Sequence, residues 1–519
     1  MLETPSLLVS ASSARRRWAA LAVLAMVVLL LSVDNTVLAL AVPALSQSLA
    51  PTAEQILWIG DIYSLSLAGL LVLMGNLADR FGRKRVLLTG ATAFGLASVL
   101  AAFAPTAEVL ILARLLLGVA GATLMPSTLS LIRNIFTDDA ERTRAIAIWS
   151  MAFGAGGALG PLVGGFLLEH FWWGAVFLIN VPIMVIVLAA GALLLPESKD
   201  LHPGRFDVPS ALLSMLTITP IVFAITHVIG SGFDAVIIGS LVVGVGSGLL
   251  FVRRQRRIDN PMLDVELFRS AAFTGAVTAN VLTIFAYAGL VFFFSQYLQF
   301  ALGYSPLEAG LAELPGTLAS IVVVALIGVA VRGLGRGRAI SLGLALGAAG
   351  LGLIAATAES GVYGWLAAGL VAVGLGTGLS MTLAGDAILS AAPPRKAGSV
   401  SAITETANEL GVVLGIAVLG SLLSATYRAT VTVPAALPEQ VRAQVVDSFA
   451  SAMTVLDAGS SAAQAAQEAF IGAIQTTAYI AAALTLAAAL LAWVLIPSPR
   501  GAAGQRPEQR GDADEVVGS

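Results

Sequence analysis

Apolar stretches long enough to cross a lipid bilayer recur along almost the whole chain. Cutting the sequence at charged or Pro/Gly-rich breaks gives about fourteen stretches, each about as long as or longer than the roughly 20 residues that a membrane-spanning helix needs. A composition of 57% hydrophobic and 11% charged residues over 519 residues also differs from that of a water-soluble domain of this size. The sequence therefore predicts an all-α integral membrane protein. The expected spans are 18–42, 56–77, 86–104, 109–133, 144–168, 174–195, 208–230, 234–252, 271–301, 307–331, 338–357, 362–391, 398–425 and 474–496.

The positions of Lys and Arg test this number of spans, because loops rich in positive charge stay in the cytoplasm. With the N-terminus placed inside, 25 of the 28 Lys and Arg residues fall in segments that are expected to be cytoplasmic. Arg428 and Arg442 fall outside, and Arg114 lies within a span. An odd number of spans would place the basic C-terminal tail on the wrong side. We therefore expect a multi-pass protein with both termini in the cytoplasm.

The spans divide into two groups of six, with two extra spans between the groups. Residues 1–195 form the first six-helix bundle, and 196–260 hold a polar linker with the two extra transmembrane helices. Residues 261–496 form the second six-helix bundle, and 497–519 form a cytoplasmic tail. The expected fold is thus two six-helix bundles with two extra central helices.

Two segments between the spans leave alternatives open. The segment 253–269 alternates apolar and charged residues, and is either an interfacial helix or a solvated linker. The long external loop 427–470 contains a stretch with helical periodicity. That loop forms either a small helical cap over the outer mouth or a flexible connector.

Composition also excludes several classes of function. The net charge is −3 and the positive residues are spread over many loops, so no basic surface for nucleic acid is expected. The chain has no cysteine and three scattered histidines, so neither a thiolate site nor a histidine-rich metal cluster is predicted. It lacks a G-x-x-x-x-G-K-[ST] nucleotide loop and a familiar catalytic set. We expect no enzymatic activity, no metal and no cofactor.

Several ionisable residues lie inside the predicted spans, where burial costs several kcal/mol unless the side chain faces a cavity or a partner. The carboxyl groups outnumber the single arginine of this set, which neutralises at most one of them well. A carboxyl group in a low-dielectric interior holds a proton more readily than one in water. We interpret these residues as the functional site for protons and cations. They are Asp34, Asp61, Arg114, Asp386, Glu405 and Glu409, with Glu313 near the outer end of its span.

The individual acids allow more than one interpretation. Glu405 and Glu409 lie one helical turn apart, which favours one proton shared between them, although one of the two could instead hydrogen-bond a neighbouring helix. Asp34 and Asp61 lie toward the outer halves of their spans and are expected to line a central cavity; the alternative for Asp61 is a cap at its helix end. Asp386 is expected to pair with a basic residue that follows it within ten positions.

A short basic turn, GNLADRFGRKRVLL at 75–88, separates the second and third spans. Its G-x-L-x-D-R-x-G-R-K pattern resembles the signature loop of the major facilitator superfamily. A degenerate copy at 328–338 follows the second span of the second half. We expect Asp79 to join a salt-bridge network or to cap a helix of the other half, which would stabilise the outward-facing state. The gating residues expected in this loop are Gly75, Asp79, Arg80, Gly82 and Arg83.

Three other spans resemble the fourteen-span drug and proton antiporters of that superfamily. The first contains DNTVLALAVP at 34–43, which matches the D-x-T-V-x-x-x-A-x-P motif of these antiporters. The second, WIGDIYSLSLAG at 58–69, is similar to the quaternary-ammonium efflux pumps. The fourth, LILARLLLGVAGA at 110–122, resembles the L-x-x-x-R-x-x-Q-G motif, with Leu117 where the family usually has Gln.

The fifth span carries GGALGPLVGG at 156–165, in which small residues share one helical face and a proline permits a kink. The pattern resembles the antiporter motif of drug-exporting branches of the superfamily, in which this helix packs between the two halves. The resemblance adds Gly160 and Pro161 to the expected gating residues.

These resemblances imply a bacterial inner-membrane antiporter that uses the proton gradient to export lipophilic, mainly cationic drugs and biocides. The expected partners are lipophilic cations, protons and membrane lipids, with no nucleic acid, and the expected form is a monomer. The rival classes are an exporter of an endogenous metabolite, antibiotic or lipid, a channel, and a membrane-embedded enzyme. Aromatic rings beside the acids would give a cation an apolar and cation-π surface. The candidates are Tyr63, Trp149, Phe153, Tyr287, Phe293 and Tyr297.

Overall fold

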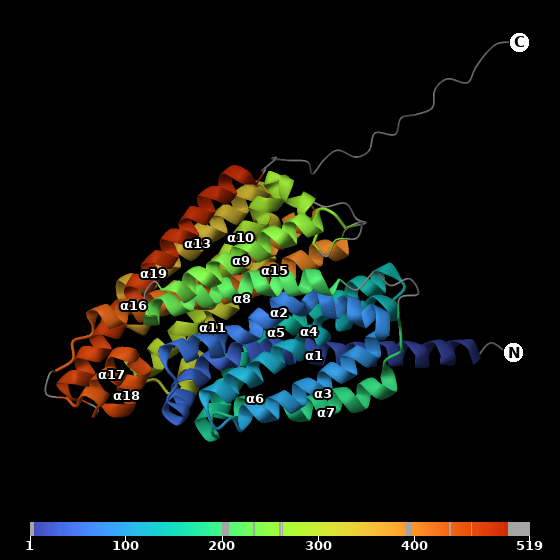
Figure 1. Ribbon diagram of the computed structural model, residues 1–519. Coiled ribbons are helices and arrows are strands. Elements are labelled where there is room, and N and C mark those ends of the chain that lie inside the picture. The colour runs from blue at the N-terminus through green and yellow to red at the C-terminus, as the bar shows by residue number, and fades with distance from the viewer. Residues whose placement is uncertain are drawn as a thin grey trace, which may run out of the picture.

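Helices account for almost all regular structure in the computed structural model (Figure 1), and its described residues contain no strand. These residues are 5–199, 207–231, 234–258, 261, 263–390, 397–434, 437–457 and 459–496. Within them, 14 helical segments are long and apolar enough to span a membrane, which confirms the predicted fold class and number of spans. The first half contains α1 (Pro5–Leu49), α2 (Ala53–Phe81), α3 (Arg83–Ala102), α4 (Ala107–Ile135), α5 (Asp139–His170), α6 (Ala175–Leu178) and α7 (Asn180–Leu194), followed by the pair α8 (Val208–Ser231) and α9 (Ala235–Gln255).

The second half begins after a short 3-10 turn and has its own breaks within spans. Two spans change helix type part of the way along, at η2 and η3, and a third does so at η6. The elements are η1 (Val265–Arg269), α10 (Ala271–Gln296), η2 (Tyr297–Ala301), α11 (Pro306–Val322), η3 (Val323–Leu326), α12 (Ile327–Leu334), α13 (Arg336–Thr357), η4 (Ala358–Ser360), α14 (Tyr363–Ser390), α15 (Ala397–Leu414), η6 (Gly415–Leu419), α16 (Gly420–Thr430), α17 (Glu439–Asp447), α18 (Phe449–Val455) and α19 (Ser461–Leu495).

Local sequence explains why the helices begin and end where they do. Thr52 caps α2, because its hydroxyl accepts a hydrogen bond from the Gln55 amide at 3.2 Å while the Gln55 side chain accepts one from the Thr52 amide at 2.9 Å. Gly82 alone separates α2 from α3, with φ of 111°. A side chain at Gly82 would be strained and would also meet Glu197, so this turn requires glycine.

Each half is a bundle of closely packed helices. In the first half α1 packs against α5, α2 against α4, and α3 against α4 and α7. In the second half α13 packs against α14 and α19, while α10 contacts α14, α15 and α19. The two halves meet mainly where α2 packs against α15 and where α5 packs against α11.

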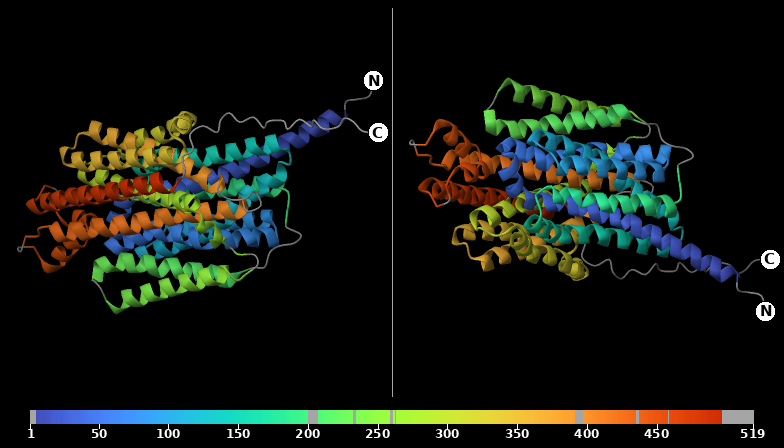
Figure 2. Two further views of the ribbon diagram at one scale, coloured as in Figure 1. Left: turned by 90° about the horizontal axis from the view of Figure 1, so that it is seen from above. Right: turned by 90° about the horizontal axis from the view of Figure 1, so that it is seen from below.

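The inserted pair α8 and α9 lies at one edge of the molecule, as the green ribbons of Figure 2 show. Leu65 of α2, Val222 of α8 and Val413 of α15 form one apolar cluster, so α8 covers the junction of α2 and α15. At the start of the pair, Arg254 donates to Asp207 at 2.8 Å. Burial raises the pKa of the Asp207 carboxyl group, but hydrogen bonds from Arg254 and Ser210 outweigh burial and lower the pKa below its usual 3.8.

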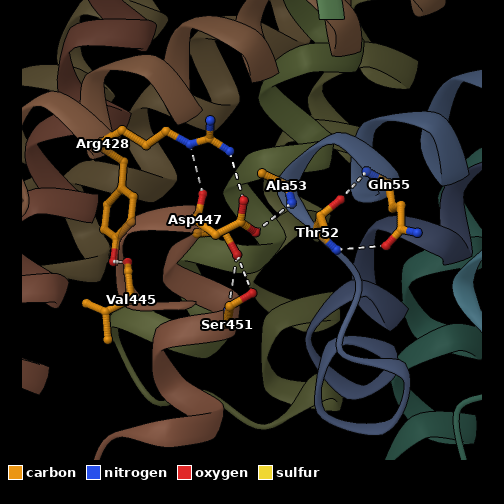
Figure 3. Close-up of polar contacts among 9 residues, drawn as sticks. Thr52, Ala53, Gln55, Arg428, Val445, Asp447 and Ser451 are labelled. Carbon is orange, nitrogen blue, oxygen red and sulfur yellow. Dashed lines mark hydrogen bonds and ion pairs between the residues drawn. The ribbon is translucent and has the colours of Figure 1, made fainter. Parts of the chain in front are cut away.

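Two short helices, α17 and α18, form a cap on one end of the bundle, which we name the cap end. Arg428 at the end of α16 donates to the Asp447 carboxylate at 2.9 Å, and the same carboxylate accepts from the backbone amide of Ala53 at 3.0 Å (Figure 3). Tyr427 donates to the carbonyl of Val445 at 2.9 Å. The described part of 427–470 therefore forms a helical cap rather than an irregular connector, and a pocket of about 840 Å³ lies between the cap and α2.

Further hydrogen bonds join the two halves at the cap end. Gln299 of η2 donates to the carbonyl of Leu40 in α1 at 3.1 Å, and the amide of Leu307 in α11 donates to Glu169 of α5 at 3.5 Å. In Figure 1 the helices of the two halves lie together near α17 and α18 and diverge toward the opposite end. We name that opposite end, which carries Gly82, the loop end.

The structure differs from the expected segments most clearly at 253–269 and at the start of the last span. The described part of 253–269 forms no long interfacial helix, because α9 ends at Gln255 and only the 3-10 turn η1 follows. Gln255 anchors this connection by donating to Ser210 at 2.6 Å and accepting from the Leu263 amide at 3.1 Å. The last span begins at Ser461 and not at residue 474, since Ser460 caps an alanine-rich segment that extends the helix beyond its most apolar part.

Candidate functional site

A buried ion pair lies in the first half. Arg114 of α4 donates from Nη1 to the Oδ2 atom of Asp34 in α1 at 3.1 Å, and the two side chains are 1% and 0% exposed. Both residues were predicted from their positions within spans. The pair satisfies one charge with the other, so Asp34 is not among the acids that lack a positive partner.

Two neutral residues that the sequence reasoning missed complete this site. Asn180, the first residue of α7, donates from Nδ2 to the Oδ1 atom of Asp34 at 2.7 Å and to the hydroxyl of Ser98 in α3 at 3.1 Å. Both Asn180 and Ser98 are fully buried. An amide within an otherwise apolar span is the sequence signal that could have identified Asn180, because a buried polar group requires hydrogen-bond partners.

Arg114 also has partners in α2. Its Nε donates to the carbonyl of Ile59 at 3.2 Å, and its Cζ lies 4.6 Å from the centroid of the Tyr63 ring. Leu117 stands where the motif that this span resembles has Gln. The contacts with Ile59 and Tyr63 are partners that the arginine has in this chain. Tyr63 is also within electrostatic range of Asp34 and Glu409.

Other buried acids have carboxylate oxygens without a hydrogen-bond partner. Both oxygens of Asp61 are of this kind, as are Oε1 of Glu313 and Oε2 of Glu409. Within the described part of the chain, Arg114 is the only Lys or Arg that is buried. Buried carboxyl groups therefore outnumber buried cations there. The described residues contain no group of three potential His, Asp or Glu metal ligands.

The pair on α15 links the second half to the first. Glu409 lies close to Ser64 of α2 and within electrostatic range of Arg114 and Glu405. Glu405 accepts a long hydrogen bond from Asn408 at 3.4 Å. Asn408 in turn accepts from Asn280 of α10 at 2.7 Å. Glu313 lies elsewhere, on α11 near Tyr287 of α10.

The predicted aromatic residues have different neighbours in the structure. Tyr63 stacks on Arg114 and Tyr287 lies near Glu313, whereas Trp149 of α5 donates to Thr128 of α4 at 3.1 Å. Phe293 packs edge to face on its neighbour Phe292 with ring centroids 5.0 Å apart, and Gly60 of α2 lies against that same neighbour. The remaining two are Phe153, which is 36% exposed, and Tyr297, which donates to the carbonyl of Ala358 at 2.6 Å.

The predicted gating loop is attached to its own half. Asp79 forms an ion pair with Arg83 at 2.8 Å, one helical turn away. The amide of Arg83 donates to the carbonyl of Ser198 at 2.8 Å, Arg80 lies near the ring of Phe81, and Gly75 lies against Pro126 of α4.

Asp386 has a different partner from those considered in the sequence. It forms an ion pair with Arg336 of α13 at 2.7 Å, and its side chain is 54% exposed. The basic residues that follow it, Arg395 and Lys396, lie outside the described residues. Asp386 is thus at the surface of the loop end and is not part of the buried set.

The small residues of α5 pack on both halves. Gly160 lies against Thr36 of α1, so that no side chain fits between them. The carbonyl of Pro161 lies against Gly310 of α11, and a methyl group on Gly165 would lie 2.8 Å from the Cα of Leu307. At the cap end, α5 and α11 therefore approach to backbone contact.

Among the described residues, fourteen helical segments long and apolar enough to span a membrane pack in two halves with charged side chains buried among them, an arrangement typical of multi-pass membrane transporters. The model of the Major Facilitator Superfamily matches residues 24–416 and 276–517. The chain belongs to the major facilitator superfamily, whose members are transporters rather than enzymes.

Relatives that are named for drug efflux or drug resistance resemble the chain over nearly its full length. The multidrug efflux pump LfrA of Mycolicibacterium smegmatis is 48% identical over 92% of this chain and 96% of its own length. The methyl viologen resistance protein SmvA of Salmonella typhimurium is 35% identical over 92% of this chain and 98% of its own length. Among solved structures, a bacterial homologue of the human lysosomal transporter Spinster matches with a TM-score of 0.63 and 17% identity, covering 93% of this chain and 99% of that one. This last likeness concerns the fold.

Proposed function

We propose that this protein is a proton-coupled antiporter that exports lipophilic, mainly cationic drugs and biocides. The observation that carries the proposal is the excess of buried carboxyl groups over buried cations. Asp61, Glu313 and Glu409 have carboxylate oxygens without a partner, while the buried arginine already pairs with Asp34. Groups of this kind bind protons or a cationic substrate, since an unpaired charge in the membrane interior is costly.

The similarity to LfrA and SmvA supports drug export as the transported class. The name of SmvA refers to methyl viologen, an aromatic dication that needs the negative charge and apolar surface that such a site would supply. We assign the cap end to the outside of the inner membrane and the termini to the cytoplasm, in accord with the distribution of Lys and Arg.

In the proposed cycle the two halves rock around a shared site. A cation enters from the loop end, displaces protons from the acids of α1, α2 and α15, and leaves after the cap end opens. Protons from outside then return to the acids. Substrate and proton compete for the same carboxyl groups, which links their binding free energies.

A second candidate is export of an endogenous antibiotic, metabolite or lipid on the same scaffold. The observation that favours it is the 34% identity to the tetracenomycin C resistance and export protein of Streptomyces glaucescens over 79% of this chain. A neutral or anionic substrate would not depend on the unpaired acids. Transport that survives their neutralisation would therefore favour this candidate.

The test is uptake of ethidium into inverted membrane vesicles, with and without a pH gradient. Asp61→Asn is the sharper variant, because this carboxyl group has no partner to leave behind, whereas Asp34→Asn also leaves Arg114 buried without its counter-ion. We expect gradient-dependent accumulation in the parent and a loss of about tenfold or more in Asp61→Asn and Asp34→Asn. Asp457→Asn, in the loop after α18, is the matched control.

Two outcomes would contradict the proposal. A folded parent that accumulates no cation would remove cation export, and equal accumulation with and without the gradient would remove proton coupling. Asp61→Asn at parental rates would exclude Asp61 from the coupling site.

A further inference from the structure

Only one of the two polar atoms of the Asn180 side chain has hydrogen-bond partners. Its Nδ2 atom donates both to Asp34 at 2.7 Å and to Ser98 at 3.1 Å, whereas its Oδ1 atom is buried without a partner. Buried amide oxygens normally accept a hydrogen bond. The network therefore contains one unused acceptor next to the carboxyl group that the proposed mechanism protonates.

The observed orientation fits an ionised Asp34. Its Oδ1 accepts from Asn180 and its Oδ2 accepts from Arg114, so each oxygen receives a donor. A protonated carboxyl group has an O–H that needs an acceptor, and the N–H groups that face Asp34 in this orientation cannot supply one.

A half turn of the amide group provides this acceptor without moving the backbone, and it places Nδ2 where Oδ1 has no partner in the structure. The turn exchanges oxygen for nitrogen, so Oδ1 faces Asp34 and Ser98. The oxygen has two lone pairs, which accept the Asp34 O–H and the Ser98 O–H together, because a serine hydroxyl both donates and accepts. The last torsion of asparagine is broad and roughly two-fold, so both orientations are open to it.

We propose that Asn180 is a positioning residue that serves both protonation states of Asp34 by reversing its amide group. This inference rests on the proposed proton coupling through Asp34. The arriving proton binds a carboxylate oxygen and Asn180 turns to accept that O–H. The two hydrogen bonds that Nδ2 donates to Asp34 and Ser98 are then replaced by two that Oδ1 accepts, and no other covalent bond is made or broken. Arg114 then faces a neutral acid and is left to attract Glu409, the other acid within its electrostatic range.

The groups around Asp34 define what else contributes to its titration. Arg114 from α4 carries the positive charge, and Tyr63 from α2 lies within electrostatic range. Ser98 from α3 and Asn180 from α7 are neutral, and Glu409 from α15 interacts with Tyr63 and Arg114. The role of Asn180 is therefore separable by a substitution that changes no charge.

Infrared spectroscopy can measure the protonation of Asp34 and its hydrogen bonds. The full chain is labelled with carboxyl-¹³C aspartate, placed in lipid and titrated without substrate. The band that Asp34→Asn removes reports the protonated acid. We expect Asn180→Leu, which keeps the volume but neither donates nor accepts, to move that band and displace its titration midpoint by about one pH unit. Asn134→Leu, an exposed asparagine that bonds Ser198, is the matched control.

Two further variants distinguish the proposed role of Asn180 from misfolding and from a role in which Asn180 only donates hydrogen bonds. Ser98→Ala removes the second donor to the same amide oxygen, so it also moves the band, by less. Asn180→Thr keeps a group that both donates and accepts, and brings the midpoint back toward that of the parent. An unchanged band in Asn180→Leu and Ser98→Ala, or no protonated Asp34 at any pH where the protein is folded, would overturn the proposal.

The experiment is independent of the transport assay. It uses no substrate, so failure of cation export leaves the infrared result interpretable. If the parent exports a cation but the Asp34 band ignores Asn180, the amide switch is wrong and the proposed function stands.

Discussion

At the scale of single residues, Arg114 is fixed by three different contacts. The Asp34 carboxylate, the Ile59 carbonyl and the Tyr63 ring surround its guanidinium group. A planar guanidinium satisfies these partners together, whereas the single ammonium group of lysine cannot reach all three. The site therefore requires arginine for its geometry as well as for its charge.

We predict that Arg114→Lys lowers the stability of the folded protein by about 2–3 kcal/mol, because a buried carboxylate and a buried carbonyl lose donors. Thermal unfolding of the purified protein in detergent measures the effect. Arg133→Lys, at an exposed position of the same helix, is the control and should leave the unfolding temperature unchanged. Equal unfolding temperatures for both variants would contradict this account of the site.

The charged members of the site could be predicted, but their pairing could not. An ionisable residue within an apolar span stands out in any sequence, which is why Asp34, Asp61 and Arg114 were identified. Asn180 and Ser98 are neutral, and such residues are common in spans as contacts between helices. Only the tertiary arrangement of α1, α3, α4 and α7 brings them together.

At the scale of elements, the cap joins helices that are far apart in the sequence. The Asp447 carboxylate lies at the end of α17, pairs with Arg428 of the second half and accepts from the first amide of α2 in the first half. A carboxylate at a helix N-terminus is favourable because unpaired amides and the helix dipole point toward it. One side chain thus connects the cap to both halves.

We predict that Asp447→Ala loosens the cap without unfolding the spans. Trypsin cleavage after Arg442, which lies within α17, should become about fivefold faster, since a loss of roughly 1 kcal/mol from a partly exposed contact changes a local opening equilibrium by that factor. The fragment pattern of intact cells or outward-oriented vesicles gives the rate. Asp457→Ala is the matched control, and equal cleavage in both variants would count against the connection.

Spans and cap differ in how well sequence predicts them. A span must be about 20 apolar residues, and this rule located each of the fourteen within a few residues at most ends. The helices of the cap have 9 and 7 residues, too short for a periodic pattern to decide. Hydropathy did not predict the early start of α19, because alanine and glutamine favour a helix without being strongly apolar.

At the scale of the whole molecule, the two halves meet at the cap end through small residues at the contact of α5 and α11. Gly310 lies against the carbonyl of Pro161, and Gly165 lies against Leu307. Helices within a membrane associate through close packing of this kind, because lipid offers no hydrophobic gain for their contact.

We predict that Gly310→Ala shifts the population toward a state in which the cap end is open, because the added methyl group meets the backbone of Pro161. Spin labels on Ser48→Cys and Glu359→Cys, in a chain without natural cysteine, report the distance across that end. We expect a longer distance to gain population, by about fivefold.

Gly352→Ala is the control for this measurement. A methyl group there meets no atom within 4 Å, so its distance distribution should match that of the parent. An unchanged distribution in Gly310→Ala would show that the α5 and α11 contact does not hold this end closed.

The overall architecture followed from the sequence, whereas the state of the molecule did not. Hydropathy and the distribution of basic residues depend on each span separately, so they give the number of spans and predict their orientation. Which end is closed depends on contacts such as that between Gln299 and Leu40, whose partners are 259 positions apart. Any sequence that alternates between two states must be compatible with both of them.

The two halves are attached to each other at several separate places at the cap end, and this affects how readily ions leak through the protein. The halves are held there at α1 with η2, at α2 with α17 and at α5 with α11. We expect that release at one place leaves the other two in contact, so that a fluctuation of one helix opens no continuous path for ions. A cell that makes many copies of this protein would therefore keep its membrane potential.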